Sequence, residues 1–524
     1  MIVATFCTLG VAAWIGWGLY VWTRVDVRIE GVTSGAVLRP LQTDSMVVDI
    51  TFANARDVPH ATVRFDGNEL ADLESSDRGF RWTIEGPLPE GFHVLEVRVP
   101  RPILGPAVFR AEFTVDGTAP PLRVPEITEP VAVDAEVRIP GSTEPGSALT
   151  LDGEPVEVDD DGRFEIVLDR PHYGSPMLLR AVDEAGIASF TTIVTPVEYP
   201  EVRHVHVRAE DWADRQVREQ ILTLVDERKI TAVQLDVKDE AGIVGHTTQV
   251  AHARAIGAAA DLYDLEEAVE LLQDHGAHVI VRIVAFNDTK FGTDAWQRGA
   301  RDLVVQNTDG SMLERGEGVF LSYAQPEVRA YLTELAIEAA EMGVDDIMFD
   351  YIRRPDGAIE DMRIPGLTTS PEQGIIDFLR EIRTSLRAAD HDVYLGAAVF
   401  GLAAKEPRGA REIAQDVRGM APWLDYVAPM IYPSHFGRGE YGIDVPNDEP
   451  GLLIERSLAD FQALVAERGT ALVPWLQDFS YAGRTYGHDE VRAQIDAACS
   501  LGVINHGLWN AVSSYTVSAL GQCP

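Results

Sequence analysis

The chain has 524 residues, 46% of them apolar, which is enough for about two or three domains with separate cores. Its 83 acidic side chains against 44 basic ones give a formal charge of -39. Because this charge repels the phosphates of nucleic acids and of anionic lipids, it argues against a nucleic-acid-binding function.

The chain begins with an uncharged apolar stretch, residues 2–22 (IVATFCTLGVAAWIGWGLYVW), which contains Cys7. A helix of this length crosses the hydrocarbon core of a bilayer, so we predict a transmembrane anchor over residues 1–24, with a signal peptide as the alternative. Arg24 and Arg28 follow the span and by themselves favour a cytoplasmic C-terminal side. The domain types that follow favour instead an anchored protein with an extracellular catalytic domain, or a secreted one.

Two regions of short alternating strands come next. Residues 25–120 contain runs such as VVDITFA and FHVLEVRVP between Gly, Pro and Asp turns, which is typical of a β-sandwich. Residues 121–198 repeat the pattern with the turns Asp152-Gly153 and Asp161-Gly162, and look like a bacterial immunoglobulin-like module. We interpret the acidic run at residues 159–161 as a turn, although calcium binding is an alternative.

From residue 199 to 524, strands alternate with long amphipathic helices, several of which end at glycine. This alternation indicates βαβ units and a parallel sheet. The predicted strands cover residues 203–209, 231–239, 277–286, 345–352, 393–401, 425–433, 471–479 and 504–512. Eight such repeats fit a closed (β/α)8 TIM barrel.

Active sites of such barrels lie at the C-terminal ends of the strands, so polar residues there are functional candidates. On the second strand, period-two alternation places Gln234, Asp236 and Lys238 on the inward face. The candidate substrate-binding residues are Lys238, Asp239, Arg282, Asp288, Tyr351, Arg353, Tyr432, His435, Trp475, Gln477 and Trp509. Aromatic rings that stack on sugars, combined with groups that bind hydroxyls, are suited to a carbohydrate site.

Glycoside cleavage uses two carboxyl groups, one as the acid and one as the nucleophile or base. Asp350 is the first choice for nucleophile or base, because Arg353 or Arg282 nearby would keep it ionised. The alternative for Asp350 is a buried ion pair that braces the barrel. For the acid, the leading candidates are Asp478 and Asp236; the further candidates are Asp239 and Asp288. We expect Arg354 to be a solvated loop residue.

Two of the three cysteines flank the last strand. Cys499 and Cys523 form a disulfide if the compartment is oxidising. No cofactor is expected, and the sequence predicts no oligomeric state.

Six segments in order resemble a known family: LDVKDEAG, VIVRIVAFND, IMFDYIRRP, PMIYPSHF, PWLQDF and GLWNA. Over about residues 200 to 518 the chain resembles the glycoside hydrolase barrel family that is filed as a domain of unknown function near the α-amylase-like barrels. The resemblance implies a (β/α)8 fold, hydrolysis of a polysaccharide, and Asp350 as the catalytic aspartate of strand four. Related barrels carry an acid at the end of strand five or six, where this chain has AVFGLA and MIYPSHF.

Two other functions are open. His204 and His206, two apart on the first strand, would suit a metal-dependent amidohydrolase type of barrel. A non-catalytic glycan-binding or cell-wall-binding protein, with the immunoglobulin-like modules as spacers, is the second alternative.

Overall fold

The computed structural model describes residues 25–101, 105–171, 176–315, 318–405, 413–466, 469–481 and 483–523. The predicted transmembrane span and Cys7 lie outside these ranges. Within them, no helix combines the length and the apolar character that a membrane crossing needs.

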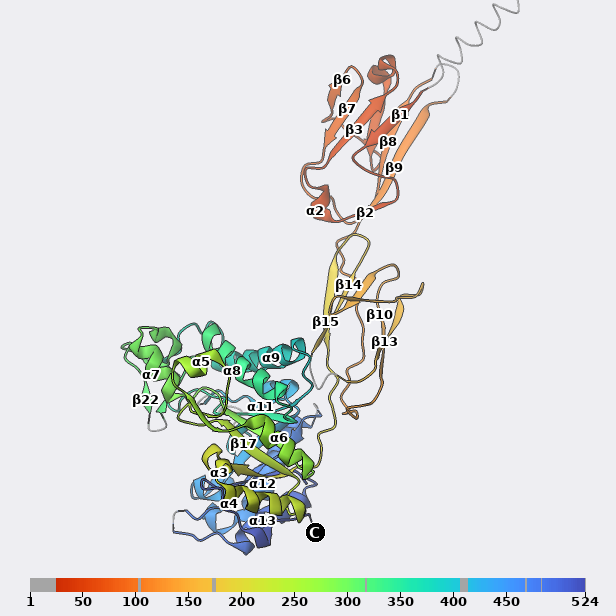
Figure 1. The fold of residues 1–524 in the computed structure, drawn as a ribbon. Helices are drawn as coiled ribbons and strands as arrows, with labels where there is room; N and C mark the ends of the chain where they lie inside the picture. The colour runs from red at the N-terminus through yellow and green to blue at the C-terminus, as the bar shows by residue number, and fades with distance from the viewer. Residues whose placement is uncertain are drawn as a thin grey trace, which may run out of the picture. The chain divides into compact units, whose positions relative to one another are not determined.

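The N-terminal region consists of two β-sheets with one shared core (Figure 1). In the order of pairing, the first sheet contains β1 (Val27–Glu30), β3 (Val47–Phe52), β7 (Gly79–Thr83) and β6 (Glu74–Ser76). The second contains β2 (Ala36–Leu38), β9 (Ala107–Val115), β8 (Gly91–Val99), β4 (Thr62–Phe65) and β5 (Asn68–Glu69). Ile50 and Trp82 of the first sheet are buried in the same cluster as Val97 and Phe113 of the second.

A second group of strands follows. β10 (Val137–Ser142) pairs with β13 (Arg163–Leu168), and β12 (Glu154–Val156), β11 (Ala148–Leu151), β14 (Met177–Val182) and β15 (Ala188–Ile193) form a sheet. Burial alternates along β13, as expected for period two. The acidic run before β13 forms a tight turn, since Asp159 Oδ1 accepts the backbone N–H groups of Asp161 at 3.0 Å and Arg163 at 2.7 Å.

The described chain divides into two compact units. The first holds the described residues up to Pro125, with Arg138–Ile166 and Leu178–Thr192. The second holds Glu126–Val137, Val167–Met177 and the described residues from Ile193 onward, which include the whole barrel.

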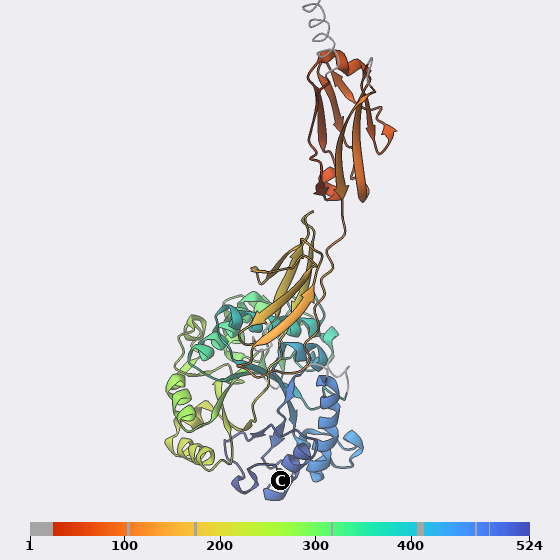
Figure 2. The same cartoon turned by 90° about the vertical axis from the view of Figure 1, so that its right-hand side faces the viewer.

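The barrel has eight parallel strands, and this prediction is confirmed. They are β16 (Arg203–Val207), β17 (Ala232–Lys238), β20 (His278–Val284), β24 (Asp346–Asp350), β26 (Tyr394–Phe400), β27 (Tyr426–Ile431), β29 (Trp475–Gln477) and β30 (His506–Trp509). Because β16 pairs with both β17 and β30, the sheet closes on itself. In Figure 2 the helices surround the strands.

Helices lie between the barrel strands, as the sequence predicts, and several of them end at glycine. They are α3 (Ala209–Ala213), α4 (Arg215–Asp226), α5 (Ala251–Ala255), α6 (Leu265–Asp274), α7 (Thr289–Gln297), α8 (Pro326–Glu341), α9 (Pro371–Ala388), α11 (Val417–Met420), α12 (Pro450–Val465) and α13 (His488–Ser500). Asp214 caps α4 and Asp264 caps α6. Gly276, Gly343 and Gly502 follow three of the helices with φ of 81°, 81° and 77°, a conformation that glycine adopts without strain.

Two local features differ from the predicted pattern. Strand seven is interrupted, because Pro474 has no N–H for the ladder and separates β28 (Ala471–Leu472) from β29. After β17 an unpredicted insertion adds β18 (Val244–His246) and β19 (Ala259–Tyr263) to the sheet. Glu338 of α8 anchors it by accepting hydrogen bonds from Thr248 and the backbone of Gln249.

Short elements complete the fold. The two-stranded pairs are β21 (Gln306–Asn307) with β25 (Met362–Arg363) and β22 (Glu314–Arg315) with β23 (Gly318–Val319). The short helical segments are α2 (Pro40–Thr43), η1 (Ala55–His60), η2 (Arg301–Leu303), η3 (Ile359–Asp361), η4 (Ala421–Trp423), η5 (Pro433–His435), η6 (Glu440–Gly442), η7 (Pro446–Asp448) and η8 (Val517–Ala519).

The predicted disulfide between Cys499 and Cys523 is confirmed, with an S–S distance of 2.06 Å. It joins α13 to the C-terminal segment, which Arg492 of α13 also holds by donating to the carbonyl of Gln522 at 3.1 Å.

Removing this disulfide by changing both cysteines to serine is expected to lower the free energy of unfolding by about 3.5 kcal/mol. The bond closes a loop with a sequence separation of 24 residues, and the open chain gains entropy mainly in the unfolded state. Urea unfolding of the oxidised protein and of the double variant measures the difference. The reduced wild-type protein should match the variant; equal stability of all three would contradict a stabilising role.

Candidate active site

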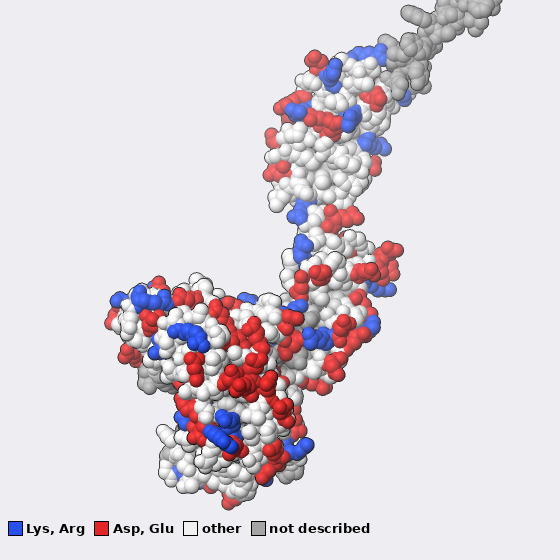
Figure 3. Space-filling model, viewed as in Figure 1, with Lys and Arg blue, Asp and Glu red and all other residues white. Residues whose placement is uncertain are grey.

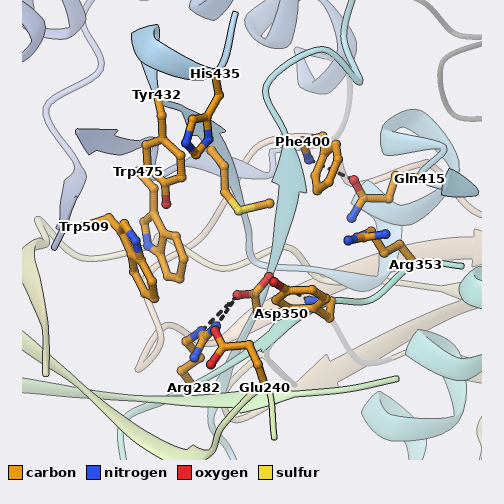
Figure 4. A pocket seen from close by; sticks show the side chains of 12 residues that line it. Glu240, Arg282, Asp350, Arg353, Phe400, Gln415, Tyr432, His435, Trp475 and Trp509 are labelled. Atoms are coloured by element: carbon orange, nitrogen blue, oxygen red, sulfur yellow. Dashed lines mark hydrogen bonds and ion pairs between the residues drawn. The ribbon is translucent and has the colours of Figure 1, made fainter. Parts of the chain in front are cut away.

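A cavity of about 240 Å³ opens at the C-terminal ends of the barrel strands. It is lined by Glu240, Arg282, Asp350, Tyr351, Arg353, Phe400, Gln415, Met430, Tyr432, His435, Trp475 and Trp509. In Figure 4 Trp475, Trp509, Tyr432 and His435 lie on one side and Phe400, Gln415 and Arg353 on the other. Asp350, Arg282 and Glu240, which we call the floor, lie lowest in this view. Eight of the lining residues are among the candidates that the sequence predicts.

Asp350, the last residue of β24, is paired with Arg282 of β20. Its Oδ2 accepts hydrogen bonds from Arg282 Nε at 3.0 Å and Nη2 at 2.7 Å, and its Oδ1 accepts the N–H of Tyr351 at 2.7 Å. Tyr351 has a φ of 48°, which is uncommon for a residue with a side chain. This left-handed residue turns the chain immediately after Asp350 and leaves the carboxylate at the cavity.

Arg282 is the centre of the floor. It is 1% exposed and also donates to Asp236 Oδ1 at 3.0 Å and to Glu240. Burial opposes the charge of Arg282, but Glu240, Asp236 and Asp350 together keep its pKa well above the ordinary value. The guanidinium carbon lies 5.1 Å from the ring centroid of Trp509, so the cation also contacts the aromatic wall.

Asp236 lies behind the cavity and does not line it. It is held between Arg282 and His206, whose Nε2 is 2.9 Å from Asp236 Oδ1. Burial raises the pKa of Asp236, but His206 and Arg282 outweigh burial and keep the pKa below its usual range. This ionised aspartate supports the position of Arg282, and it does not line the cavity in which a leaving group would bind.

Glu240 is a lining residue that was not among the predicted site residues. Its side chain is 40% exposed and contacts the same nitrogen, Arg282 Nη2, as Asp350 does. Burial is the largest single effect and raises the pKa of Glu240, but the charge and the hydrogen bond of Arg282, together with a backbone hydrogen bond, outweigh it and lower the pKa below the ordinary value. The available signal was the spacing: residue 240 continues the inward alternation of Asp236 and Lys238 beyond the strand end.

One wall of the cavity is a pair of stacked indoles. The rings of Trp475 and Trp509 lie 4.9 Å apart at an angle of 18°, and His206 stacks on Trp509 at 4.1 Å. Two buried polar atoms on this side, Trp475 Nε1 and Tyr432 Oη, have no hydrogen-bond partner in the described structure. Because buried polar groups are nearly always hydrogen-bonded, this wall is suited to a ligand that carries hydroxyl groups.

The opposite wall contains Arg353, which does not pair with Asp350. Its guanidinium lies within 5.2 Å of the ring centroids of Phe320, Tyr351 and Phe400, and it donates to Asp356 Oδ1 at 3.2 Å. Of the two arginines proposed from the sequence to keep Asp350 ionised, the contacts therefore favour Arg282.

The prediction that Arg354 is solvated is wrong. Arg354 is 1% exposed and donates to the carbonyls of Pro355 at 3.0 Å and Gly357 at 2.6 Å. It is buried because the loop after β24 folds back over its guanidinium and supplies these backbone acceptors.

The remaining predicted residues lie outside the cavity. Lys238 and Asp288 form a buried pair at 3.0 Å, and Asp239 closes the turn to Ile243 by accepting its backbone N–H. Gln477 accepts the N–H of Ser434 and donates to the carbonyl of Phe479, so it ties two loops together.

Asp478, the first predicted acid, also points away from the cavity. Its Oδ2 accepts the backbone N–H of Thr516 at 2.7 Å and its Oδ1 accepts the Thr516 hydroxyl at 2.6 Å. Burial raises the pKa of Asp478, but its contacts are with the C-terminal segment.

The histidines of β16 have other partners. Among the described residues no cluster of three or more His, Cys, Asp or Glu side chains has the arrangement to hold a metal ion. His206 contacts Asp236, and burial lowers the pKa of His204 to about 3.

A profile of the DUF4015 family, described as "Putative glycosyl hydrolase domain", matches residues 204–515. The chain belongs to this family. The match covers the barrel from the first strand to the segment after the eighth, so it includes every residue of the cavity. The resemblance seen in the sequence is thereby confirmed.

Several solved structures are similar. A hypothetical protein from Ruminiclostridium thermocellum is 26% identical, over 37% of this chain and 96% of that one, with a TM-score of 0.33. The glycoside hydrolase domain of PgaB (BpsB) from Bordetella bronchiseptica is 17% identical, over 60% and 95%, with a TM-score of 0.44. The glycoside hydrolase domain of PelA from Pseudomonas aeruginosa is 14% identical, over 62% and 100%, with a TM-score of 0.36. No curated protein matches the sequence.

Proposed function

We propose that the barrel is a glycoside hydrolase that cuts an extracellular or cell-wall polysaccharide. One observation carries the proposal: two carboxylates, Asp350 and Glu240, share Arg282 at the floor of a cavity walled by the stacked Trp475 and Trp509. Paired carboxyl groups beside a platform for sugar rings are what glycoside cleavage requires.

Asp350 acts as the nucleophile, because Arg282 and the N–H of Tyr351 hold its carboxylate at the cavity. Glu240 replaces Asp478 and Asp236 as the acid, since neither aspartate lines the cavity. Both carboxylates contact one nitrogen, so their nearest oxygens lie within about 6 Å, the sum of two hydrogen bonds. This upper limit lies below the ~6.5–9.5 Å of inverting enzymes, which favours a retaining mechanism.

The reaction then has two steps. Asp350 attacks the anomeric carbon while the bond to the leaving oxygen breaks and Glu240 gives that oxygen its proton. Glu240, now ionised, removes a proton from water, whose oxygen attacks the anomeric carbon and releases the sugar from Asp350. Both residues return to their starting states, and the configuration is retained.

The cavity holds one sugar unit. Its volume of about 240 Å³ is below the ~300–1,000 Å³ of sites for drug-sized ligands. The stacked indoles of Trp475 and Trp509 form the apolar wall beside the sugar ring, and Tyr432 Oη and Trp475 Nε1 bind hydroxyl groups.

The charge at the floor narrows the substrate class. Even with Glu240 protonated as the acid, the two carboxylates of Asp236 and Asp350 outnumber the one guanidinium of Arg282, and Arg353 is paired with Asp356. On the face shown in Figure 3, Asp and Glu also cover more of the surface than Lys and Arg. A negative floor repels a second anion, so the substrate is a glycan of neutral or amino sugars and not of uronic acids.

The test is incubation of the purified protein with neutral, amino-sugar and uronic-acid polysaccharides, followed by measurement of new reducing ends. We expect new ends from a member of the first two classes. A glycan that binds without new ends would favour the non-catalytic binding protein instead, and cleavage of a polyuronate alone would contradict the substrate class.

The pH profile tests the role of Glu240. Because kcat/KM follows the protonation of the free enzyme, it falls as Glu240 loses its proton. Arg282 lowers that pKa below its ordinary value, so we expect kcat/KM to be highest in acid and to decrease already at a pH below the ordinary pKa of a glutamate side chain. Measurements of kcat/KM from acidic to neutral pH decide this, and a maximum near pH 7 would exclude Glu240 as the acid.

We further propose that residues 1–24 anchor the chain in the membrane, that residues 25–120 and 121–198 are immunoglobulin-like spacers, and that residues 199–524 form an extracellular catalytic domain. The Cys499–Cys523 disulfide supports an oxidising compartment. Protease treatment of intact cells tests this placement: degradation of the barrel without lysis is expected, and protection until lysis would contradict it.

A further inference from the structure

A row of aromatic rings continues from the cavity to the surface. We call His435, Phe479 and Tyr481 the aromatic ledge. Tyr432 on the cavity wall lies 5.4 Å from His435 and 5.7 Å from Phe479, and His435 lies 5.7 Å from Tyr481, measured between ring centroids. The ledge is therefore continuous with the wall that carries Tyr432.

The outer end of the ledge is open to solvent. Tyr481 is 56% exposed, and it is the one aromatic ring among the largely exposed apolar side chains of the barrel residues that the structure describes. A ring in this position adds little to the core, because most of its surface stays in water. Partial burial lowers the pKa of His435, so its ring is uncharged at neutral pH and presents a flat face without a charge.

Hydrogen bonds to the backbone of the two loops hold the ledge in place. Gln477 joins the two loops that carry it, by accepting the N–H of Ser434 at 3.0 Å and donating to the carbonyl of Phe479 at 2.8 Å. Tyr481 exchanges backbone hydrogen bonds with Arg484 at 3.2 and 3.1 Å. Rings that are fixed before binding lose little conformational freedom when a ligand stacks on them.

We propose that the aromatic ledge binds the sugar units next to the one in the cavity, so that the enzyme cuts within a polysaccharide chain and not only at its end. The inference rests on the proposed function and adds the mode of attack. A cavity that holds one unit leaves the rest of the chain outside, and the ledge provides ring faces for stacking directly beside the opening.

The binding test uses the Asp350→Asn variant, which keeps the chain uncut. Glucose and glucosamine oligomers of increasing length are titrated by calorimetry into this variant with and without Tyr481→Ala. We expect the affinity for the oligomers to increase with their length beyond one unit. Tyr481→Ala should make this increase about tenfold smaller. Phe92→Ala, on the N-terminal sheets and 63% exposed, is the matched control and should remove none of it.

The cleavage test uses the protein without the Asp350 change. Early products from a long chain should be mixed oligomers, and Tyr481→Ala should reduce kcat/KM about tenfold more for the long chain than for a single-unit aryl glycoside. Release of single sugar units alone, or an equal loss of kcat/KM on both substrates, would contradict the proposal that the aromatic ledge binds the neighbouring sugar units. If Tyr481→Ala weakens the binding of long oligomers but no cleavage occurs, the ledge binds glycan and the proposed hydrolase function is wrong.

Discussion

Replacing Asp350 by asparagine is expected to reduce kcat/KM for the polysaccharide by about 10³–10⁴-fold, while the protein stays folded. Asparagine keeps the shape and can still accept the N–H of Tyr351, but its neutral amide cannot form the covalent bond to the anomeric carbon. Initial rates of reducing-end formation by the wild-type and variant proteins measure the loss, and circular dichroism checks the fold.

Asp478→Asn is the matched control for this prediction. The two aspartates are equally buried, 3% and 4% exposed, and each ends a barrel strand or follows its end. Because Asp478 contacts Thr516 and not the cavity, its variant should keep most of the activity. If Asp478→Asn is folded but inactive, the prediction from the sequence that Asp478 is the acid would be supported. If Asp350→Asn is active, Asp350 is not the nucleophile.

A companion variant, Glu240→Gln, separates the acid from the nucleophile. Loss of the acid should reduce cleavage of the polysaccharide strongly but spare an aryl glycoside with a dinitrophenyl leaving group, which departs without a proton. Equal losses on both substrates would show that Glu240 does not act as an acid.

Replacing Arg282 by methionine is expected to lower the free energy of unfolding by about 3–5 kcal/mol. The change leaves the buried Asp236 and Asp350 and the partly exposed Glu240 without the guanidinium that they share. Urea unfolding at neutral pH measures the loss. Arg438→Met removes an exposed pair with Asp444 and should cost less than about 1 kcal/mol.

The effect of Arg282→Met should also depend on pH. In the wild-type protein the lowered pKa values of Asp236 and Glu240 contribute stability above the pKa of the unfolded chain, and this contribution is lost as the pH falls through the folded values. In the variant these carboxyl groups take up protons at higher pH. The difference in stability should therefore shrink as the pH falls below about 4, and a constant difference would point to lost packing instead of lost charge.

Much of the fold follows from local pattern. Period-two strands, capped amphipathic helices and glycines after the helices indicate eight repeats, and the barrel geometry then assigns the strand ends to the active site. Asp350 and Trp509 line the cavity for this reason: each is the last residue of its strand and lies on the inward face, where only one side of the sheet faces the barrel interior.

The tertiary structure decided which charged groups meet. Beyond the end of a strand, the direction in which a side chain points depends on single backbone torsions, such as the φ of 48° at Tyr351. It also depends on interaction partners that are far away in the sequence. Thr516, 38 residues away, draws Asp478 out of the site, while Arg282 gathers Asp236, Glu240 and Asp350 from two other strands. Sequence spacing carries no information about such long-range pairing, because a buried charge takes whichever partner the closed barrel brings within reach.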